Sequence, residues 1–134
     1  EQLKAWQDKD APVWIWIMLG TNDLLQERQF TAEDTAHRME LFLQKLMAEP
    51  AVSSGKIRLH LLAPARMEYG AWVDEERLYQ ESRRLGKEYK KVAEHMGISF
   101  SDAGKWDIPV VYDGVHFSEK GHHIFAQKIQ EELK

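Results

Sequence analysis

Residues 13–23 read Val13-Trp14-Ile15-Trp16-Ile17-Met18-Leu19-Gly20-Thr21-Asn22-Asp23, and this stretch decides the fold class. Its first part, residues 13–19, is continuously apolar and rich in aromatic and β-branched side chains, which is typical of a strand with both faces buried in a parallel sheet. We therefore expect Trp14 and Trp16 to fill a core or an interface. The last four residues predict a turn at the carboxyl end of the strand.

Two more short apolar segments and three longer amphipathic ones follow this strand. The predicted strands are residues 57–62, stopped by Ala63-Pro64, and residues 98–101. The predicted helices are residues 31–47, residues 74–96 and a last helix capped by Ser118. Strands that alternate with helices predict an α/β fold, in which helices cover a parallel sheet.

Composition limits the kind of protein. The 134 residues form one expected domain, 1–134, because nothing in the sequence reads as a linker or a repeat. The formal charge of -4 is spread without a basic block, so nucleic acid is not a predicted partner. The chain has no cysteine, which leaves the compartment open. The apolar run 13–19 is far below the ~20 residues of a membrane-spanning helix, so no membrane span is predicted.

Two polar motifs carry the candidate chemistry. Asn22 follows the first strand at the end of the sheet where open α/β folds bind ligands, and its amide could donate to a substrate oxygen. Asp113 lies three residues before His116 in a glycine-containing loop, where the carboxylate could orient the imidazole as a base. Each motif alone also fits an ordinary turn with an exposed polar side chain.

A metal site is the alternative interpretation of the same loop. Asp113, His116, His122 and His123 are close in sequence and are ordinary zinc ligands. Consecutive helical residues project about 100° apart, however, so His122 and His123 cannot both face one ion together with His116. We therefore predict no metal. The other histidines, which lack a predicted acidic partner, are expected to be structural or exposed: His37, His60 and His95.

Together, the two motifs resemble conserved blocks of the SGNH (GDSL-type) ester hydrolases. The blocks are Gly20-Thr21-Asn22-Asp23 after a strand and Asp113-Gly114-Val115-His116 before Phe117-Ser118-Glu119-Lys120-Gly121-His122. The stretch between them is also similar to arylesterase-like and carbohydrate-esterase-like members, at Ala63-Pro64-Ala65 and Phe100-Ser101-Asp102-Ala103-Gly104. The resemblance covers nearly the whole chain.

This resemblance implies a three-layer, flavodoxin-like sheet and a serine esterase without a cofactor. His116 would be the base, Asp113 its partner and Asn22 an oxyanion-hole donor. The substrate would be a small-molecule ester or an acylated carbohydrate that loses a short acyl group such as acetyl. The alternatives are a non-catalytic binding or assembly module derived from such an enzyme, and a metal-dependent hydrolase that uses Asp113, His116 and His122.

The sequence departs from the family at the nucleophile, because it contains no Gly-Asp-Ser block. None of its serines is predicted on a strand-to-helix turn suited to a nucleophile. We therefore expect the family's N-terminal strands and its serine to belong to a segment missing from this chain. Without them the chain should be nearly inactive, and the strand from Val13 to Leu19 should have an open edge. That edge would pair with a completing segment or with a second copy.

Overall fold

The computed structural model describes residues 12–134. The elements follow in the order β1 (Val13–Ile17), α2 (Thr21–Gln26), α3 (Ala32–Met47), α4 (Pro50–Ser53), β2 (Ile57–Ala63), α5 (Glu76–Met96), β3 (Ser99–Asp102), a 3-10 turn η1 (Ala103–Lys105) and α6 (Glu119–Glu132). Every strand and helix predicted from the sequence is present. Ser118 caps α6 as predicted. Thr31 forms a capping box with Asp34 at the start of α3, and Gly97 ends α5 in the left-handed conformation.

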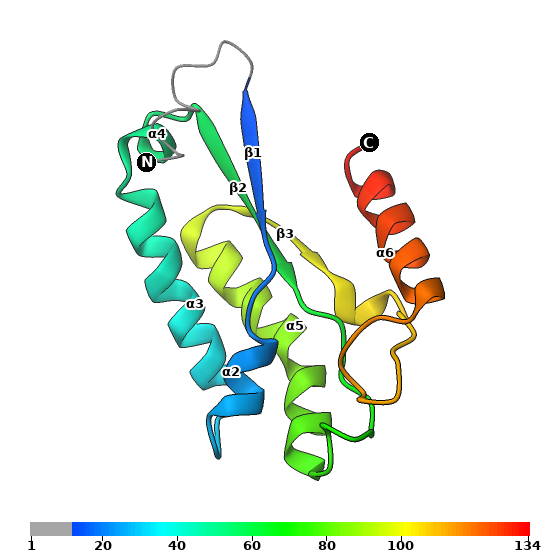
Figure 1. Cartoon of the computed structure of the whole chain (residues 1–134). Helices are drawn as coiled ribbons and strands as arrows, with labels where there is room; N and C mark the ends of the chain where they lie inside the picture. Colours follow the sequence, from blue (N-terminus) through cyan, green and yellow to red (C-terminus); the bar gives the residue numbers. More distant parts are fainter. Residues whose placement is uncertain (1–11) are drawn as a thin grey trace.

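The three strands form one parallel sheet in the order β1-β2-β3. Val13 of β1 lies beside Ile57 of β2, and Ala63 at the end of β2 lies beside Asp102 of β3. All three strands therefore finish at the same edge of the sheet, which is the lower end in Figure 1. The α/β fold predicted from the alternating segments is confirmed.

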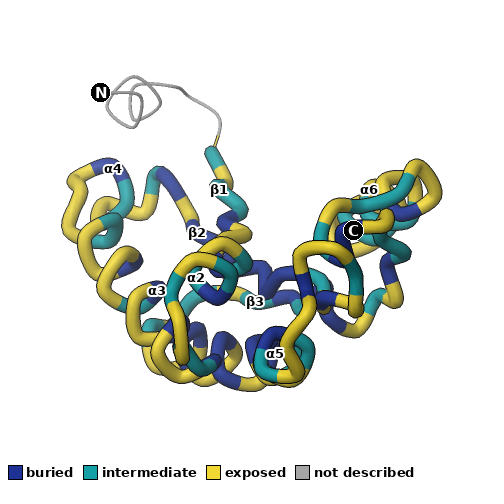
Figure 2. Tube along the Cα trace, turned by 60° about the horizontal axis from the view of Figure 1, so that its bottom comes forward, coloured by how far each residue is buried: buried dark blue, intermediate teal, exposed yellow. Residues whose placement is uncertain are grey.

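One face of the sheet is covered by α3 and α5 (Figure 1). Ile17, Leu59 and Leu61 point from the strands into this core, where they meet Leu43 of α3 and Leu85 of α5. The buried residues in Figure 2 follow this layer. It contains most of the apolar side chains that the described residues bury, and it holds the sheet in place.

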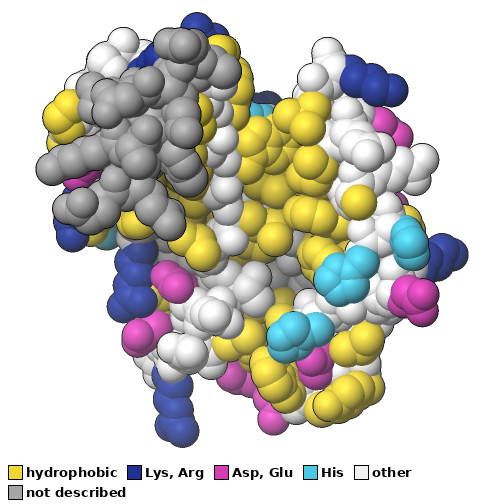
Figure 3. Space-filling view, turned by 45° about the horizontal axis from the view of Figure 1, so that its top comes forward, with side chains coloured by type: hydrophobic (Ala, Val, Ile, Leu, Met, Phe, Trp, Pro, Cys, Tyr) yellow, Lys and Arg dark blue, Asp and Glu magenta, His cyan; other side chains and the backbone are white. Residues whose placement is uncertain are grey.

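The other face is covered by α6 and only in part. Leu62, Ala103 and Ile108 form a small buried cluster there, against which partly buried side chains of α6 such as Phe125 pack. Helices on both faces give the three layers that the resemblance implied. Beside α6 the sheet is open, and a hollow of about 420 Å³ is lined by Trp14, Trp16, Met18, Leu62, Phe125, Ile129 and Leu133. We call this hollow the apolar groove; apolar side chains fill its floor in Figure 3.

The first strand differs from its prediction. β1 ends at Ile17 instead of Leu19, and only Ile17 of its residues is buried. Trp14 remains 48% exposed, and Trp16 is only partly buried. The expectation that both faces of this strand are buried is therefore wrong for the chain as described, because β1 is an edge strand and its second face borders the apolar groove. Within residues 12–134, no helix is long and apolar enough to cross a membrane.

Candidate active site

Asp113 and His116 lie together in the loop between η1 and α6. His116 Nδ1 is 2.5 Å from Asp113 Oδ2, while Asp113 Oδ1 accepts the backbone N–H groups of Val115 and His116 at 2.8 and 2.9 Å. Asp113 is only 5% exposed, whereas the side chain of His116 is 61% exposed. The loop therefore holds a buried, fully hydrogen-bonded carboxylate against one edge of an accessible imidazole.

The hydrogen bonds keep Asp113 ionised. Burial alone would raise the pKa of Asp113, but the N–H groups of Val115 and His116 and the imidazole outweigh it, so the pKa lies below its usual value. A carboxylate at this distance accepts a proton from Nδ1, so in the neutral imidazole Nδ1 carries the proton and Nε2 carries the lone pair. Nε2 is then the free, basic nitrogen of the site.

A second loop, between β2 and α5, supports the loop that carries the pair. The backbone N–H groups of Glu68, Ala71 and Trp72 donate to the carbonyl oxygens of Gly114, Tyr112 and Asp113, at 2.9, 3.0 and 3.0 Å. We call residues 66–73 the buttress loop. In the sequence this loop is visible only as a long connection between a strand and a helix. These contacts could not be read from the sequence, because they join backbone atoms that every residue has.

Glycines allow the two loops to lie this close. A side chain at Gly70 would place its Cβ 2.5 Å from the carbonyl oxygen of Tyr112. Gly114 has φ +84°, and a Cβ there would clash with the carbonyl oxygen of Glu68. Because both close approaches involve backbone atoms, neither can be relieved by moving a flexible side chain. The position of the Asp113–His116 pair thus depends on two residues without side chains.

Asn22 lies at the same edge of the sheet, in the first turn of α2 rather than in a simple turn. Its side chain is exposed, and no hydrogen bond joins it to Asp113 or His116 among the described residues. Gly20, at φ 132°, starts α2 where a Cβ would clash with the Tyr89 hydroxyl. That hydroxyl donates to the Leu19 carbonyl oxygen at 2.7 Å, which fixes the backbone just before the helix that carries Asn22.

The comparison with protein families gives one match. A model of the GDSL-like lipase/acylhydrolase family matches residues 1–124. The chain belongs to this family. A search of curated proteins found no match.

Solved structures resemble this GDSL-like chain along almost its whole length. A carbohydrate acetylesterase from Sinorhizobium meliloti superimposes with a TM-score of 0.78 at 20% identity, over 98% of this chain and 64% of its own. The M. smegmatis aryl esterase gives 0.78 at 21% identity, over 98% and 65%. A putative arylesterase from Agrobacterium tumefaciens str. C58 gives 0.76 at 23%, also over 98% and 65%. The GDSL-like chain thus spans just under two thirds of the length of these structures.

None of the serines of this GDSL-like chain hydrogen-bonds to His116 among the described residues. Ser82 accepts the backbone N–H of Met67 at 3.0 Å, and Ser118 accepts that of Gly121 at 3.0 Å as the cap of α6. Ser53 and Ser54 bond within α4. The two remaining serines, Ser99 and Ser101, bond to a different histidine.

That histidine is His60, which was predicted to be structural or exposed. It lies on the second face of β2, with Nδ1 2.7 Å from Ser99 Oγ and Nε2 2.8 Å from Ser101 Oγ, and Trp16 stacks on its ring at 4.0 Å. Burial lowers the pKa of His60, against a smaller opposing effect of Glu132. Through the contacts with Ser99 and Ser101, both ring nitrogens of His60 hold β2 to β3.

A further histidine, His95, has an acidic partner in the structure. His95 was expected to lack an acidic partner, but its Nδ1 lies 2.7 Å from Glu40 of α3, so that expectation is wrong. The two residues are far apart in sequence and meet only because α3 and α5 pack together. His122 contacts the ring of Phe117 edge-on. The described part of the chain contains no group of three acidic, histidine or cysteine side chains placed to hold a metal ion.

Proposed function

We propose that this chain contributes the base and one oxyanion donor of a serine ester hydrolase whose nucleophilic serine lies in a polypeptide segment outside this sequence. The observation that carries the proposal is the Asp113–His116 pair, with a buried carboxylate on Nδ1 and an accessible Nε2 at the carboxyl edge of a parallel sheet. Membership of the GDSL-like family supports an ester as the substrate.

In the proposed reaction, Nε2 of His116 takes the proton of the serine hydroxyl as its oxygen attacks the ester carbonyl. Asp113 stabilises the imidazolium that results. The tetrahedral intermediate collapses when Nε2 gives this proton to the departing alcohol oxygen, which leaves an acyl-serine. Water then attacks the acyl-serine while Nε2 takes a proton from it, and Nε2 gives this proton to the serine oxygen as the acid leaves. The Asn22 amide would donate to the carbonyl oxygen as it becomes negative.

The open side of the molecule supports a completing segment. Within residues 12–134 β1 is an edge strand, and an apolar edge strand favours pairing with another strand. The apolar groove next to it leaves Trp14 and Leu133 uncovered. The similar structures are longer than the matched part, since this chain covers 64–65% of them. We propose that the segment pairs with β1, covers the groove and places its serine near His116.

The substrate class follows from the same comparison. The matched structures include a carbohydrate acetylesterase and aryl esterases, and the shared chemistry in those names is an ester with a ring-bearing alcohol. We propose that the completed protein removes a short acyl group, such as acetyl, from an alcohol of this kind.

The test uses the longest polypeptide that the gene encodes and, beside it, the 134-residue chain. We expect the longer protein to hydrolyse a short-chain aryl acetate and to be labelled by a serine-directed fluorophosphonate. His116→Ala should lower the rate by on the order of 10⁴-fold or more, because the nucleophile and base act as one unit. His123→Ala, an exposed histidine on α6, is the matched control and should leave the rate unchanged.

Two results would contradict the proposal. One is hydrolysis that is unaffected by His116→Ala. The other is fluorophosphonate labelling of a serine within the 134-residue chain. A longer protein without hydrolysis would instead support a binding or assembly module.

A further inference from the structure

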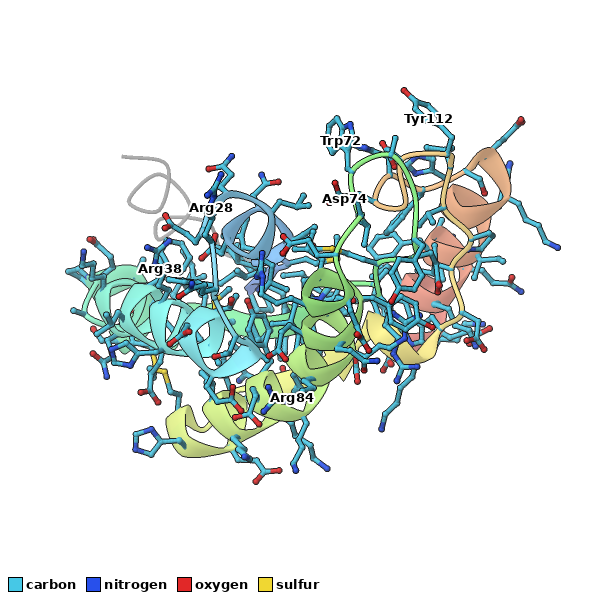
Figure 4. The ribbon with its side chains drawn as sticks, turned by 90° about the horizontal axis from the view of Figure 1, so that it is seen from below. Arg28, Arg38, Trp72, Asp74, Arg84 and Tyr112 are labelled. Carbon is cyan, nitrogen blue, oxygen red and sulfur yellow. The ribbon has the colours of Figure 1, made fainter. Side chains whose placement is uncertain are left out.

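Exposed aromatic side chains gather beside the Asp113–His116 pair. Trp72 of the buttress loop is 52% exposed, and Tyr112, next to Asp113, is 82% exposed. Figure 4 shows both side chains projecting outward in the same direction from neighbouring loops. Contact between large aromatic rings and water is unfavourable, and a ligand or partner that covers the rings removes this cost, so a pair of them at one site indicates binding.

Trp72 touches the candidate base itself. Its ring lies 5.1 Å from the ring of His116, centroid to centroid, in an edge-on arrangement with an interplanar angle of 79°. The contact leaves the imidazole accessible, since the His116 side chain is still 61% exposed. A ligand that binds at the exposed imidazole next to Trp72 therefore also contacts the indole ring.

Backbone hydrogen bonds hold together the two loop segments that carry these rings. Trp72 N–H donates to the carbonyl oxygen of Asp113 at 3.0 Å, and Ala71 N–H donates to that of Tyr112 at 3.0 Å. Gly70 lies so close to Tyr112 that no side chain fits between them. Two aromatic residues fixed to each other through their main chains form a preorganised surface, which reduces the entropy that a ligand loses on binding.

The chemistry of the proposed reaction decides which part of the ester this surface meets. The base must return its proton to the departing alcohol oxygen, so the alcohol part of the ester lies beside Nε2. The acyl carbonyl oxygen instead lies toward the oxyanion donors. Because Trp72 contacts the imidazole ring, we assign it to the alcohol side.

We propose that Trp72 and Tyr112 form the binding site for the alcohol part of the ester, and that this alcohol carries a six-membered ring. The proposal rests on the proposed function, which assigns His116 as the base. A pyranose presents an apolar C–H face and an aryl group a π face, and either can stack on an indole or phenol ring. Trp72 and Tyr112 determine specificity in this scheme and take no proton.

The test measures binding of the alcohol without any hydrolysis. The 134-residue chain, labelled with ¹⁵N, is titrated with methyl β-D-xylopyranoside, with phenol and with ethanol as the acyclic control. We expect the two ring compounds to shift the indole N–H resonance of Trp72, and ethanol to leave it unchanged at equal concentration. Whichever ring compound binds more tightly distinguishes a sugar from an aryl alcohol.

Substitutions test whether Trp72 and Tyr112 are the residues that bind the ring compounds. Trp72→Ala and Tyr112→Ala should each weaken ring binding by about tenfold. Trp14→Ala removes another half-exposed tryptophan, far from this loop on β1, and should not change it. The titration involves no hydrolysis, so its failure is distinguishable from a failure of the base assignment, which the hydrolysis experiment tests.

Three outcomes would overturn the proposal. The first is the absence of any shift at Trp72 with both ring compounds. The second is ring binding that survives the Trp72→Ala, Tyr112→Ala double substitution. The third is a loss of self-association in that double variant, measured by sedimentation, without an effect on ring binding, which would make the surface a contact between two copies.

Discussion

At the scale of single residues, His60 makes the stability of the chain sensitive to pH. Its pKa is lowered by burial in the folded state, so the unfolded chain binds a proton first as the pH falls. The contribution of the neutral imidazole is fully present above about pH 6.5, the ordinary value, and is lost as the pH falls toward the folded-state pKa. The free energy of unfolding should therefore decrease on mild acidification.

Urea unfolding at about pH 7.5 and about pH 5.5 measures this effect, because carboxylates stay ionised across that interval. His60→Gln should show a smaller difference between the two pH values than the natural chain. His123→Gln removes an exposed histidine and should keep the full difference. An unchanged pH dependence in His60→Gln would assign the effect to other groups.

Sequence reasoning about the candidate site was most successful at the scale of single residues. Asp113 and His116 are three positions apart, so a turn brings them together without help from the rest of the chain. His95 and Glu40 meet only through packing of two helices, and this pair was missed. Local spacing thus predicted the pair, whereas partners distant in sequence required the fold.

At the scale of elements, the close contact between the buttress loop and residues 112–114 controls the position of the candidate base. Gly114 and Gly97 both have positive φ, but only Gly114 has backbone atoms where a Cβ would lie. Gly97→Ala should cost about 1 kcal/mol of stability, from conformation alone. Gly114→Ala should cost more and should displace the Asp113–His116 loop from the buttress loop.

Urea unfolding gives the two stabilities, and the low-field proton resonance of His116 Nδ1–H reports the pair itself. We expect that resonance to shift or vanish in Gly114→Ala and to persist in Gly97→Ala. Equal losses of stability, with the resonance intact in both variants, would mean that the loops do not depend on their close approach.

Elements also show why some predictions succeeded and others failed. The strands and long helices followed from apolar spacing and capping residues, because local sequence determines them strongly. The helix α2 was read as a turn, since its six residues are too few for a periodic pattern. The partial exposure of β1 depends on what lies beside it in the sheet, and apolar composition cannot report that.

At the scale of the whole molecule, the open side next to β1 should make the isolated chain self-associate. The edge strand and the apolar groove together present uncovered apolar surface, which a second copy can cover in the absence of the completing segment. Trp14→Lys places a charge on this surface at a half-exposed position and should favour the monomer.

Sedimentation velocity over a range of concentrations measures the association. Phe42→Lys is the matched control, because Phe42 is a similarly exposed aromatic residue on α3. It should associate as the natural chain does. A chain that stays monomeric at all concentrations would contradict both the open edge as a contact surface and its proposed pairing.

The backbone contacts between the buttress loop and residues 112–114 have a consequence for protein engineering. Main-chain hydrogen bonds do not depend on side-chain identity, so Ala71, Trp72 and Tyr112 can be randomised in a library while the Asp113–His116 pair keeps its geometry. Variation at Gly70 or Gly114 would eliminate most clones. A search for new alcohol preferences can therefore concentrate on the exposed positions of two short loops.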